Sequence, residues 1–506
     1  MNLNKIIIGF AALILFAACS KFDELNTNSD SATKVNSKLL ATGAIMGIMK
    51  PSSGVGFVDS QFLPKYLAWG EGSRGNQYNN FGRASFDSFT TLRNYRLMAE
   101  LAEERDRDAY EALALFLESY LIYNQTIAVG DIPYSEILKG KENLLTPKYD
   151  AQKDIFKSLL TNLDRSVELF GNASDFEGDP IFGGNVNKWR KVVNAFELRV
   201  LINLSKKESD TDLNVKQKFA QVYQRGLLME GNGDNLQLVF SSKSGQLYPF
   251  NIAYNKHFDY PMLSNTLMDI LQENNDYRMF YFASPSKAKL AEGKVESDFD
   301  AYVGVEVSDP IEDIRAKYVS GEYCGFNKRF IYYEPGEPYI LIGYAEQNFI
   351  LAEAALRGWI TEDASLFYTK GIRAHFDFLR EWTPDDVTYH HGRKITDEVI
   401  DDYLVNPSVQ LSGEFEDKLE MLMEQKYVAS FLQLAWQPYY DYRRTGYPVL
   451  PINPETNLNF KEPSKIPVRW LYPQVEFDYN KEQVQKALDS QYEGVDEVNK
   501  LMWILK

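Results

Sequence analysis

The sequence is poor in cysteine and in positive charge. Two cysteines, Cys19 and Cys324, occur in 506 residues, and Cys19 lies in an N-terminal leader. Cys324 is predicted to be a buried thiol, because it has no partner for a disulfide and no companion at metal-ligand spacing. The formal net charge is -17, and Lys and Arg form no run, so the backbone of a nucleic acid would be repelled. These absences exclude nucleic acid as a partner.

The sequence also lacks the short motifs of common catalytic and nucleotide-binding sites. It contains no HExxH, no P-loop and no G-x-S-x-G, and the glycines of residues 54–56 lack the third glycine of a dinucleotide site. His390-His391 has no second cluster at metal-ligand spacing, and His375 falls on an apolar helical stripe, typical of a core histidine. We predict no metal, no cofactor and no catalysis. Acid pairs such as Asp385-Asp386 leave a glycoside hydrolase as an alternative.

The N-terminus has the pattern of a lipoprotein leader. Residues 1–18 place Lys5 before an apolar run that is too short to span a membrane, which predicts a signal peptide. Residues 15–19 resemble a bacterial lipobox, which implies that Cys19 becomes the acylated first residue and anchors the protein in the outer membrane. Residues 19–37 are predicted to form a lipidated flexible tether. An ordinary secretory leader with a chance cysteine is the alternative.

Apolar residues recur at helical spacing along most of the body. The clearest pair joins a helix over residues 340–357 to a second helix with Thr361 as its expected N-cap. Two antiparallel helices joined by a few residues form a hairpin, the unit of tetratricopeptide-like arrays. We predict a mainly α-helical fold of such hairpins, with long irregular loops and a few short strands, in one domain over residues 38–506. Further helices are expected over residues 39–49, 110–124 and 151–170 and after residue 188, a short hairpin around 236–240, and a variable irregular stretch over 283–323.

Residues 419–448 are expected to form one amphipathic helix followed by an exit loop. Pro438 is predicted to end the helix, because proline lacks the N–H donor and clashes with the preceding turn. Arg443 and Arg444 are interpreted as partners of nearby carboxylates or helix ends. The expected apolar face carries Leu422, Ala429, Leu432 and Trp436, and the expected polar face carries Lys426, Ser430, Gln433 and Gln437.

Several segments resemble, in order, motifs of the SusD/RagB family, the surface lipoproteins of Bacteroidetes nutrient-uptake systems. Residues 130–136 resemble the Gly-Asp-x-Pro-Tyr-x-Glu turn of that family. The similarity continues through the opening of the helix after residue 147, the helix pair with AEAALRG at 352–358, the stretch 419–448 and the terminal segment 466–480. It covers about residues 38–485.

The resemblance implies a function as well as a fold. It implies a non-catalytic, surface-exposed lipoprotein of the outer membrane. Such a protein binds an oligosaccharide and delivers it to a SusC-like, TonB-dependent barrel transporter. A peptide ligand in the same uptake system is an alternative, and a surface glycoside hydrolase is another.

Aromatic residues, with 32 Tyr and 31 Phe, exceed what a core of this size needs and often mark binding surfaces. Residues 54–89 read as a long loop rich in aromatic and amide side chains, where binding groups tend to lie. If the ligand is a glycan, we expect aromatic platforms and polar partners here. A loop packed onto the core by the same aromatics is the alternative. The predicted platforms are Trp69, Tyr78 and Phe81, and the predicted polar partners are Arg74, Asn76, Gln77 and Asn79.

Overall fold

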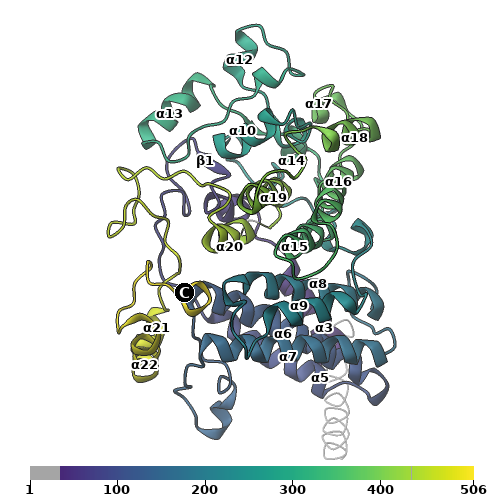
Figure 1. Ribbon diagram of the computed structural model, residues 1–506, viewed down its shortest axis with the longest axis vertical. Helices are drawn as coiled ribbons and strands as arrows, with labels where there is room; N and C mark the ends of the chain where they lie inside the picture. The colour runs from purple at the N-terminus through teal and green to yellow at the C-terminus, as the bar shows by residue number, and fades with distance from the viewer. Residues whose placement is uncertain (1–34, 435) are drawn as a thin grey trace, which may run out of the picture.

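The computed structural model describes residues 35–434 and 436–506 (Figure 1). Within these residues the chain is mainly α-helical, and six short strands form three separate antiparallel pairs. The predicted fold class is confirmed. The leader, Cys19 and most of the predicted tether lie outside the described residues.

The helices of the N-terminal half pack as hairpins in one layer, the lower part of Figure 1. α6 lies against α5 and α7, and α8 lies against α7 and α9. Leu113 and Leu117 on α6 and Leu159 and Leu163 on α7 are fully buried, as the four-residue spacing of an apolar stripe requires. The layer comprises α3 (Ser37–Met49), α5 (Leu92–Glu100), α6 (Arg107–Val129), α7 (Gln152–Asn172), α8 (Val186–Asn203) and α9 (Val215–Gln224).

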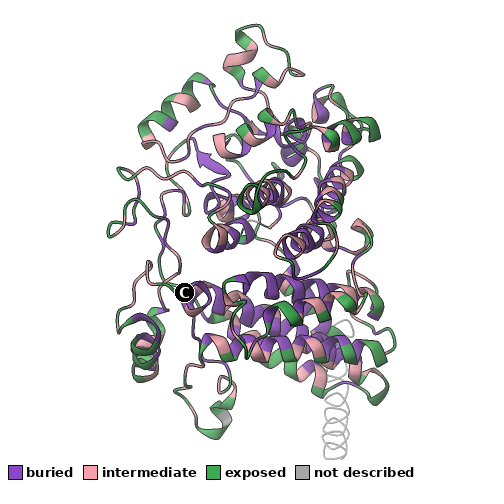
Figure 2. Ribbon diagram, in the orientation of Figure 1, coloured by how far each residue is buried: buried purple, intermediate pink, exposed green. Residues whose placement is uncertain are grey.

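One stretch of this layer, Glu104–Val129, is long and apolar enough to cross a membrane. Inside the fold, 67% of its most apolar window is buried, and Figure 2 shows the helices of this layer with buried inner faces. Its apolar surface is therefore used in packing against neighbouring helices.

A second helical group covers this layer: α15 (Tyr344–Leu356), α16 (Ala364–Trp382), α19 (Phe415–Ser430) and α20 (Trp436–Thr445). The hairpin of α15 and α16 is confirmed, but two of its predicted boundaries are wrong. Residues Tyr339–Ile342 form strand β6 rather than the first turn of the helix. Asp363, not Thr361, caps α16, because its carboxylate accepts a hydrogen bond from the Ser365 amide at 2.9 Å.

The strands pair segments that are distant in sequence. β2 (Leu236–Leu238) pairs with β6, so the local hairpin predicted around residues 236–240 is wrong. Turn residues predict that the chain changes direction, but they do not predict which strand will pair with β2. The remaining pairs are β1 (Leu67–Trp69) with β3 (Pro261–Leu263), and β4 (Ala283–Ser284) with β5 (Gly325–Phe326).

The stretch 419–448 differs most from its prediction. The first helix ends at Ser430, and Leu432 adopts a positive φ of 58° before α20 begins. Pro438 lies in the first turn of α20, where its missing N–H has no helical partner to lose. The predicted polar residues Lys426, Ser430, Gln433 and Gln437 are all buried. The helix pair is internal: Lys426 pairs with Asp441 at 2.8 Å, Ser430 donates to the Lys426 carbonyl at 2.7 Å, and Gln433 donates to Glu337 at 2.6 Å.

Arg443 and Arg444 join α20 to α15 and α6, which confirms the pairing predicted for the arginines. Arg444 binds Glu353 of α15 and Asp441, each at 2.6 Å. Burial opposes the charge of Glu353, but the guanidinium of Arg444 outweighs it and lowers the pKa of Glu353 to about 2. Arg443 donates to the carbonyl of Ile127 near the end of α6 at 2.9 Å.

The upper region of Figure 1 consists of short elements joined by long loops. The stretch 283–323, predicted to be irregular, contains two helices, α12 and α13. His375 is the core histidine that was predicted, with its Nδ1 3.1 Å from Arg278, and Cys324 is buried. The region contains α10 (Asn265–Glu273), α11 (Met279–Phe282), α12 (Lys287–Ala291), α13 (Ile311–Ser320), α14 (Lys328–Tyr332), α17 (Val387–His390) and α18 (Asp397–Val405); α4 (Val55–Val58), α21 (Gln474–Tyr479) and α22 (Lys481–Tyr492) lie elsewhere in the chain.

Candidate ligand-binding face

The seven residues predicted to bind a ligand fall into two groups. Four of them, Trp69, Gln77, Asn79 and Phe81, are buried, and Trp69 is only 4% exposed. Arg74, Asn76 and Tyr78 are half-buried and reach the surface. Ligand contact by these residues stays a prediction, but the two groups have different surroundings.

Lys65, which the sequence did not single out, holds the loop from inside. Its Nζ donates to the Gln77 carbonyl at 2.6 Å, to the Asn79 side-chain oxygen at 2.7 Å and to the Asn76 carbonyl at 3.2 Å. Burial lowers the pKa of Lys65 to about 7, although nearby Glu306 acts in the opposite direction. Residues 76–79 of the loop are therefore anchored by a side chain that lies earlier in the same loop, and the sequence shows it only as an isolated lysine.

Trp69 lies at the end of β1 and packs inside a cluster of rings. Its ring centroid is 6.3 Å from that of Phe62 and 5.4 Å from that of Tyr260. The guanidinium of Arg74 lies over the indole at 5.2 Å and pairs with Asp59 at 3.2 Å. A cation held over an aromatic face fixes the position of both groups.

The cluster continues outward from Trp69 to the surface. Tyr260 is stacked with His257 at 5.4 Å and lies 5.6 Å from Tyr318 of α13. The ring of Tyr318 packs over Gly70, where an added Cβ would lie 2.3 Å from it. We call Asp59, Trp69, Arg74, His257, Tyr260 and Tyr318 the Trp69 face.

The Trp69 face offers aromatic rings beside hydrogen-bonding groups. His257 is exposed, and Tyr260 and Tyr318 are half-buried. Burial, together with Asp259, raises the pKa of Tyr318 to about 12, so its hydroxyl stays protonated at neutral pH. The sequence analysis did not single out His257, Tyr260 and Tyr318, because they are distant from Trp69 in the sequence. The large number of tyrosines was the one general sign that tyrosines contribute to a binding surface.

The other predicted residues face different neighbours. Tyr78 donates to the Asp309 carbonyl at 2.7 Å, and Gln77 donates to the Val307 carbonyl at 3.2 Å. Phe81 stacks on Trp470 at 4.6 Å. The structure thus brings Trp69 and Arg74 together and places Phe81 against the C-terminal part of the chain.

The acid pairs have structural partners. Asp385 binds Lys394 at 2.6 Å and His390 at 3.2 Å, and Asp386 caps α17 by accepting from the Thr388 amide at 2.8 Å. Among the described residues, no three His, Cys, Asp or Glu side chains are placed to hold a metal ion.

Comparison with known proteins identifies the family. Residues 32–473 match a family model described as starch-binding and associating with the outer membrane. The chain belongs to the SusD-like family. SusD-like proteins are binding proteins associated with the outer membrane, and the resemblance noted in the sequence is confirmed. None of the curated proteins compared with the chain matches it.

Solved structures agree with this assignment. A SusD homologue from Bacteroides fragilis is 49% identical, with a TM-score of 0.91, over 93% of this chain and 100% of its own. Another SusD homologue from the same species is 34% identical, with a TM-score of 0.82, over 94% of this chain and 100% of its own. A chitin-binding protein, 22% identical over 93% of this chain and 99% of its own, shares the fold with a TM-score of 0.72.

Proposed function

We propose that this SusD-like protein captures an oligosaccharide at the cell surface and delivers it, unchanged, to a TonB-dependent outer-membrane transporter. The observation that carries the proposal is the Trp69 face, where aromatic rings lie beside charged and hydroxyl groups on a family scaffold described as starch-binding. The chitin-binding relative supports the same ligand class.

The chemistry of the Trp69 face suits a sugar. A pyranose ring has an apolar C–H surface that an aromatic ring can cover, and its hydroxyls need hydrogen-bonding partners at the edge. Tyr260 and Tyr318 supply rings with their own hydroxyls, and the Arg74–Asp59 pair supplies a donor and an acceptor. Binding of this kind requires no catalytic group.

Within the predicted loop we assign two roles. Arg74, Asn76 and Tyr78 reach the surface and contact the glycan beside Tyr260 and Tyr318. The buried members Trp69, Gln77 and Asn79 hold those residues in position, whereas Phe81 packs against Trp470. Preorganised contacts lose less conformational entropy when the ligand binds.

Delivery requires the protein to stay beside its transporter. Acylation of Cys19 would anchor the chain in the outer membrane, since three acyl chains bind a bilayer stably whereas one does not. Mass spectrometry of the N-terminal peptide from the native membrane tests the anchor, and co-purification with a barrel protein tests the partner. An unmodified N-terminus or the absence of a barrel would refute that half of the proposal.

Titration with a panel of neutral hexasaccharides tests the ligand. We expect Tyr260→Ala to weaken binding of the preferred glycan about tenfold, because aromatic anchors carry much of the energy of a binding site. Tyr479→Ala is the matched control, since Tyr479 is 79% exposed on α21 and outside the Trp69 face. Shorter products after incubation would indicate a hydrolase, and affinity for peptides over every glycan would indicate the peptide alternative.

A further inference from the structure

A hollow of about 460 Å³ opens where α6, β6 and α20 meet the segment around Trp470. It shares no residue with the Trp69 face. Its volume lies within the range of small-molecule sites, about 300–1,000 Å³. We call it the tryptophan hollow, after Trp436 and Trp470, which line it.

Five of its lining side chains are aromatic: Tyr120, Tyr339, Trp436, Tyr440 and Trp470. Trp436 is 42% exposed, and its exposed ring lines the hollow. Its ring centroid is 5.3 Å from that of Trp470, and the two planes are inclined at 54°. Two inclined aromatic faces can cover two successive rings of a bent chain.

The second platform, Trp470, is held from behind. Phe81 stacks against it at 4.6 Å with an interplanar angle of 28°, and Tyr439 meets it edge-on at 5.6 Å. The Trp470 amide donates to the Ala128 carbonyl at 3.0 Å. The ring is therefore positioned without a ligand, which lowers the entropic cost of binding.

The polar groups of the hollow include side-chain amides, and none of the described residues that line it is acidic. Its charged lining residues are Lys50 and Arg83, and Arg83 already pairs with Asp496 at 3.1 Å. The amides of Asn124 and Gln125 on α6 are half-buried and line the hollow. Amides donate and accept hydrogen bonds, as sugar hydroxyls require.

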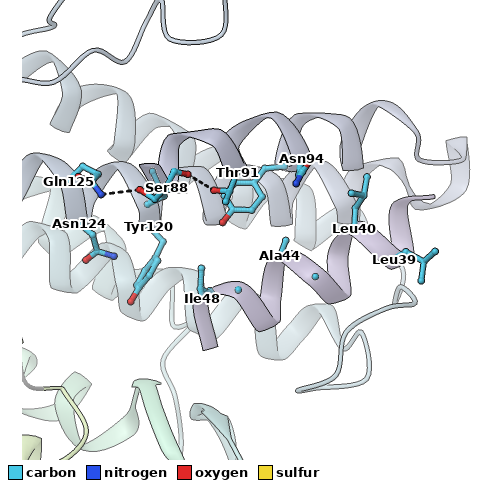
Figure 3. Close-up of a pocket in the computed structure, with 14 residues that line it drawn as sticks. Leu39, Leu40, Ala44, Ile48, Ser88, Thr91, Asn94, Tyr120, Asn124 and Gln125 are labelled. Atoms are coloured by element: carbon cyan, nitrogen blue, oxygen red, sulfur yellow. Dashed lines mark hydrogen bonds between the residues drawn. The ribbon is translucent and has the colours of Figure 1, made fainter. Parts of the chain in front are cut away.

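A second hollow, of about 490 Å³, continues along α3 (Figure 3). It shares Ile48, Tyr120, Asn124 and Gln125 with the tryptophan hollow. Figure 3 shows these side chains lined up between α3 and α6, with Gln125 donating to Ser88 at 3.0 Å. The two hollows therefore lie next to each other and share one wall.

We infer that the tryptophan hollow is a second glycan site, in which Trp436 and Trp470 cover sugar rings and Asn124 and Gln125 bind hydroxyls of an extended neutral oligosaccharide. This inference rests on the proposed function, because it takes the same ligand class to a different surface. A glycan bound at both sites would be retained longer than a glycan bound at the Trp69 face alone.

The test compares variants of the two sites in the full protein. Trp436→Ala and Trp470→Ala are titrated with neutral hexasaccharides of glucose, N-acetylglucosamine, xylose, mannose and galactose, beside Tyr260→Ala and the control Tyr479→Ala. We expect each tryptophan variant to lose about tenfold in affinity for the hexasaccharide that the wild type prefers. Trp436→Phe, which keeps a ring, should lose less. Thermal unfolding confirms that each variant is folded, and the ligand-induced change in tryptophan fluorescence should shrink in Trp436→Ala.

The outcomes separate this inference from the proposed function. Glycan binding that Tyr260→Ala weakens but both tryptophan variants leave unchanged would overturn the second site and leave the proposed function intact. A wild-type protein that binds none of the hexasaccharides would overturn both. Binding weakened by Trp436→Ala as much as by Tyr260→Ala, with Tyr479→Ala unchanged, is the result that supports two sites.

Discussion

The lower helical layer and the upper loop-rich region are held together in different ways. In the layer, long helices bury apolar stripes such as Leu159 and Leu163 against one another. In the upper region, buried charged side chains and amides bind backbone carbonyls and each other, as with Lys65, Asp276–Arg278 and Arg329–Glu337. The regular region provides a scaffold, and the irregular region carries the Trp69 face.

The difference has a physical reason. A helix satisfies its own backbone, so its side chains need only pack. A long loop leaves backbone groups unpaired, and when it is buried, side chains must supply the missing hydrogen bonds. Lys65 illustrates this, because its Nζ donates to the carbonyls of Gln77 and Asn76 at 2.6 and 3.2 Å. We therefore expect polar substitutions to matter most in the upper region and apolar truncations most in the layer.

The largest effect is expected at Arg278, whose guanidinium and the carboxylate of Asp276 are both fully buried and 2.5 Å apart. Arg278→Met should lower the free energy of unfolding by about 3–5 kcal/mol, because it leaves a buried carboxylate uncompensated. Urea unfolding measures this loss. The double variant with Asp276→Asn should regain part of it. A single variant as stable as the wild type would contradict the account of the upper region.

In the helical layer, Leu163→Ala removes a fully buried side chain of α7. We expect a loss of about 2–4 kcal/mol, from lost burial and the cavity left behind. The same unfolding experiment checks it, and Leu366→Ala on the exposed side of α16 serves as control, since Leu366 is 48% exposed. Equal losses at both leucines would show that the layer is not held by its apolar stripe.

We expect Lys65 to make the stability of the protein depend on pH. Its pKa is lowered from 10.5 to about 7 in the folded protein, so between those values the unfolded chain binds more protons and stability rises with pH. The stability of the wild type relative to Lys65→Met should therefore rise by about 1 kcal/mol per pH unit between pH 7.5 and 9.5. Unfolding of both proteins at several pH values measures it. A constant difference would mean that Lys65 keeps its ordinary pKa.

The smallest effect on stability is expected at Arg74, which pairs with Asp59 where both side chains are partly exposed. Arg74→Ala should change the free energy of unfolding by less than about 1 kcal/mol, because exposed ion pairs contribute little. The same variant should weaken glycan binding, because Arg74 belongs to the Trp69 face. Loss of stability without loss of affinity would reverse the roles given to this residue.

The sequence predicted the helices of the layer well, because periodic apolar residues are a local signal. The hairpin of α15 and α16 and the core position of His375 followed from such spacing. Sequence patterns predicted the structure less well where polar side chains are buried rather than exposed to water. Residues 419–448 form two helices rather than one, and polar side chains expected to face water are buried, as Gln433 is where it binds Glu337 at 2.6 Å.

The candidate site was predictable only in part. The composition of residues 69–81 indicated a loop with aromatic and amide groups, and Trp69 and Arg74 do lie together. Burial of Gln77 and Asn79 was not readable, because it depends on Lys65 and on the segment around Asn457. Which side chains of a loop face water depends on the segments that pack over that loop.

By itself, the sequence determined the helical character of the chain and its family, since spacing, motif order and composition are carried by neighbouring residues. Only the tertiary structure decided that Tyr260 and Tyr318 join Trp69, and that Trp436 and Trp470 line a hollow with α6. Those contacts join residues far apart along the chain, and no local pattern specifies which distant surfaces will meet.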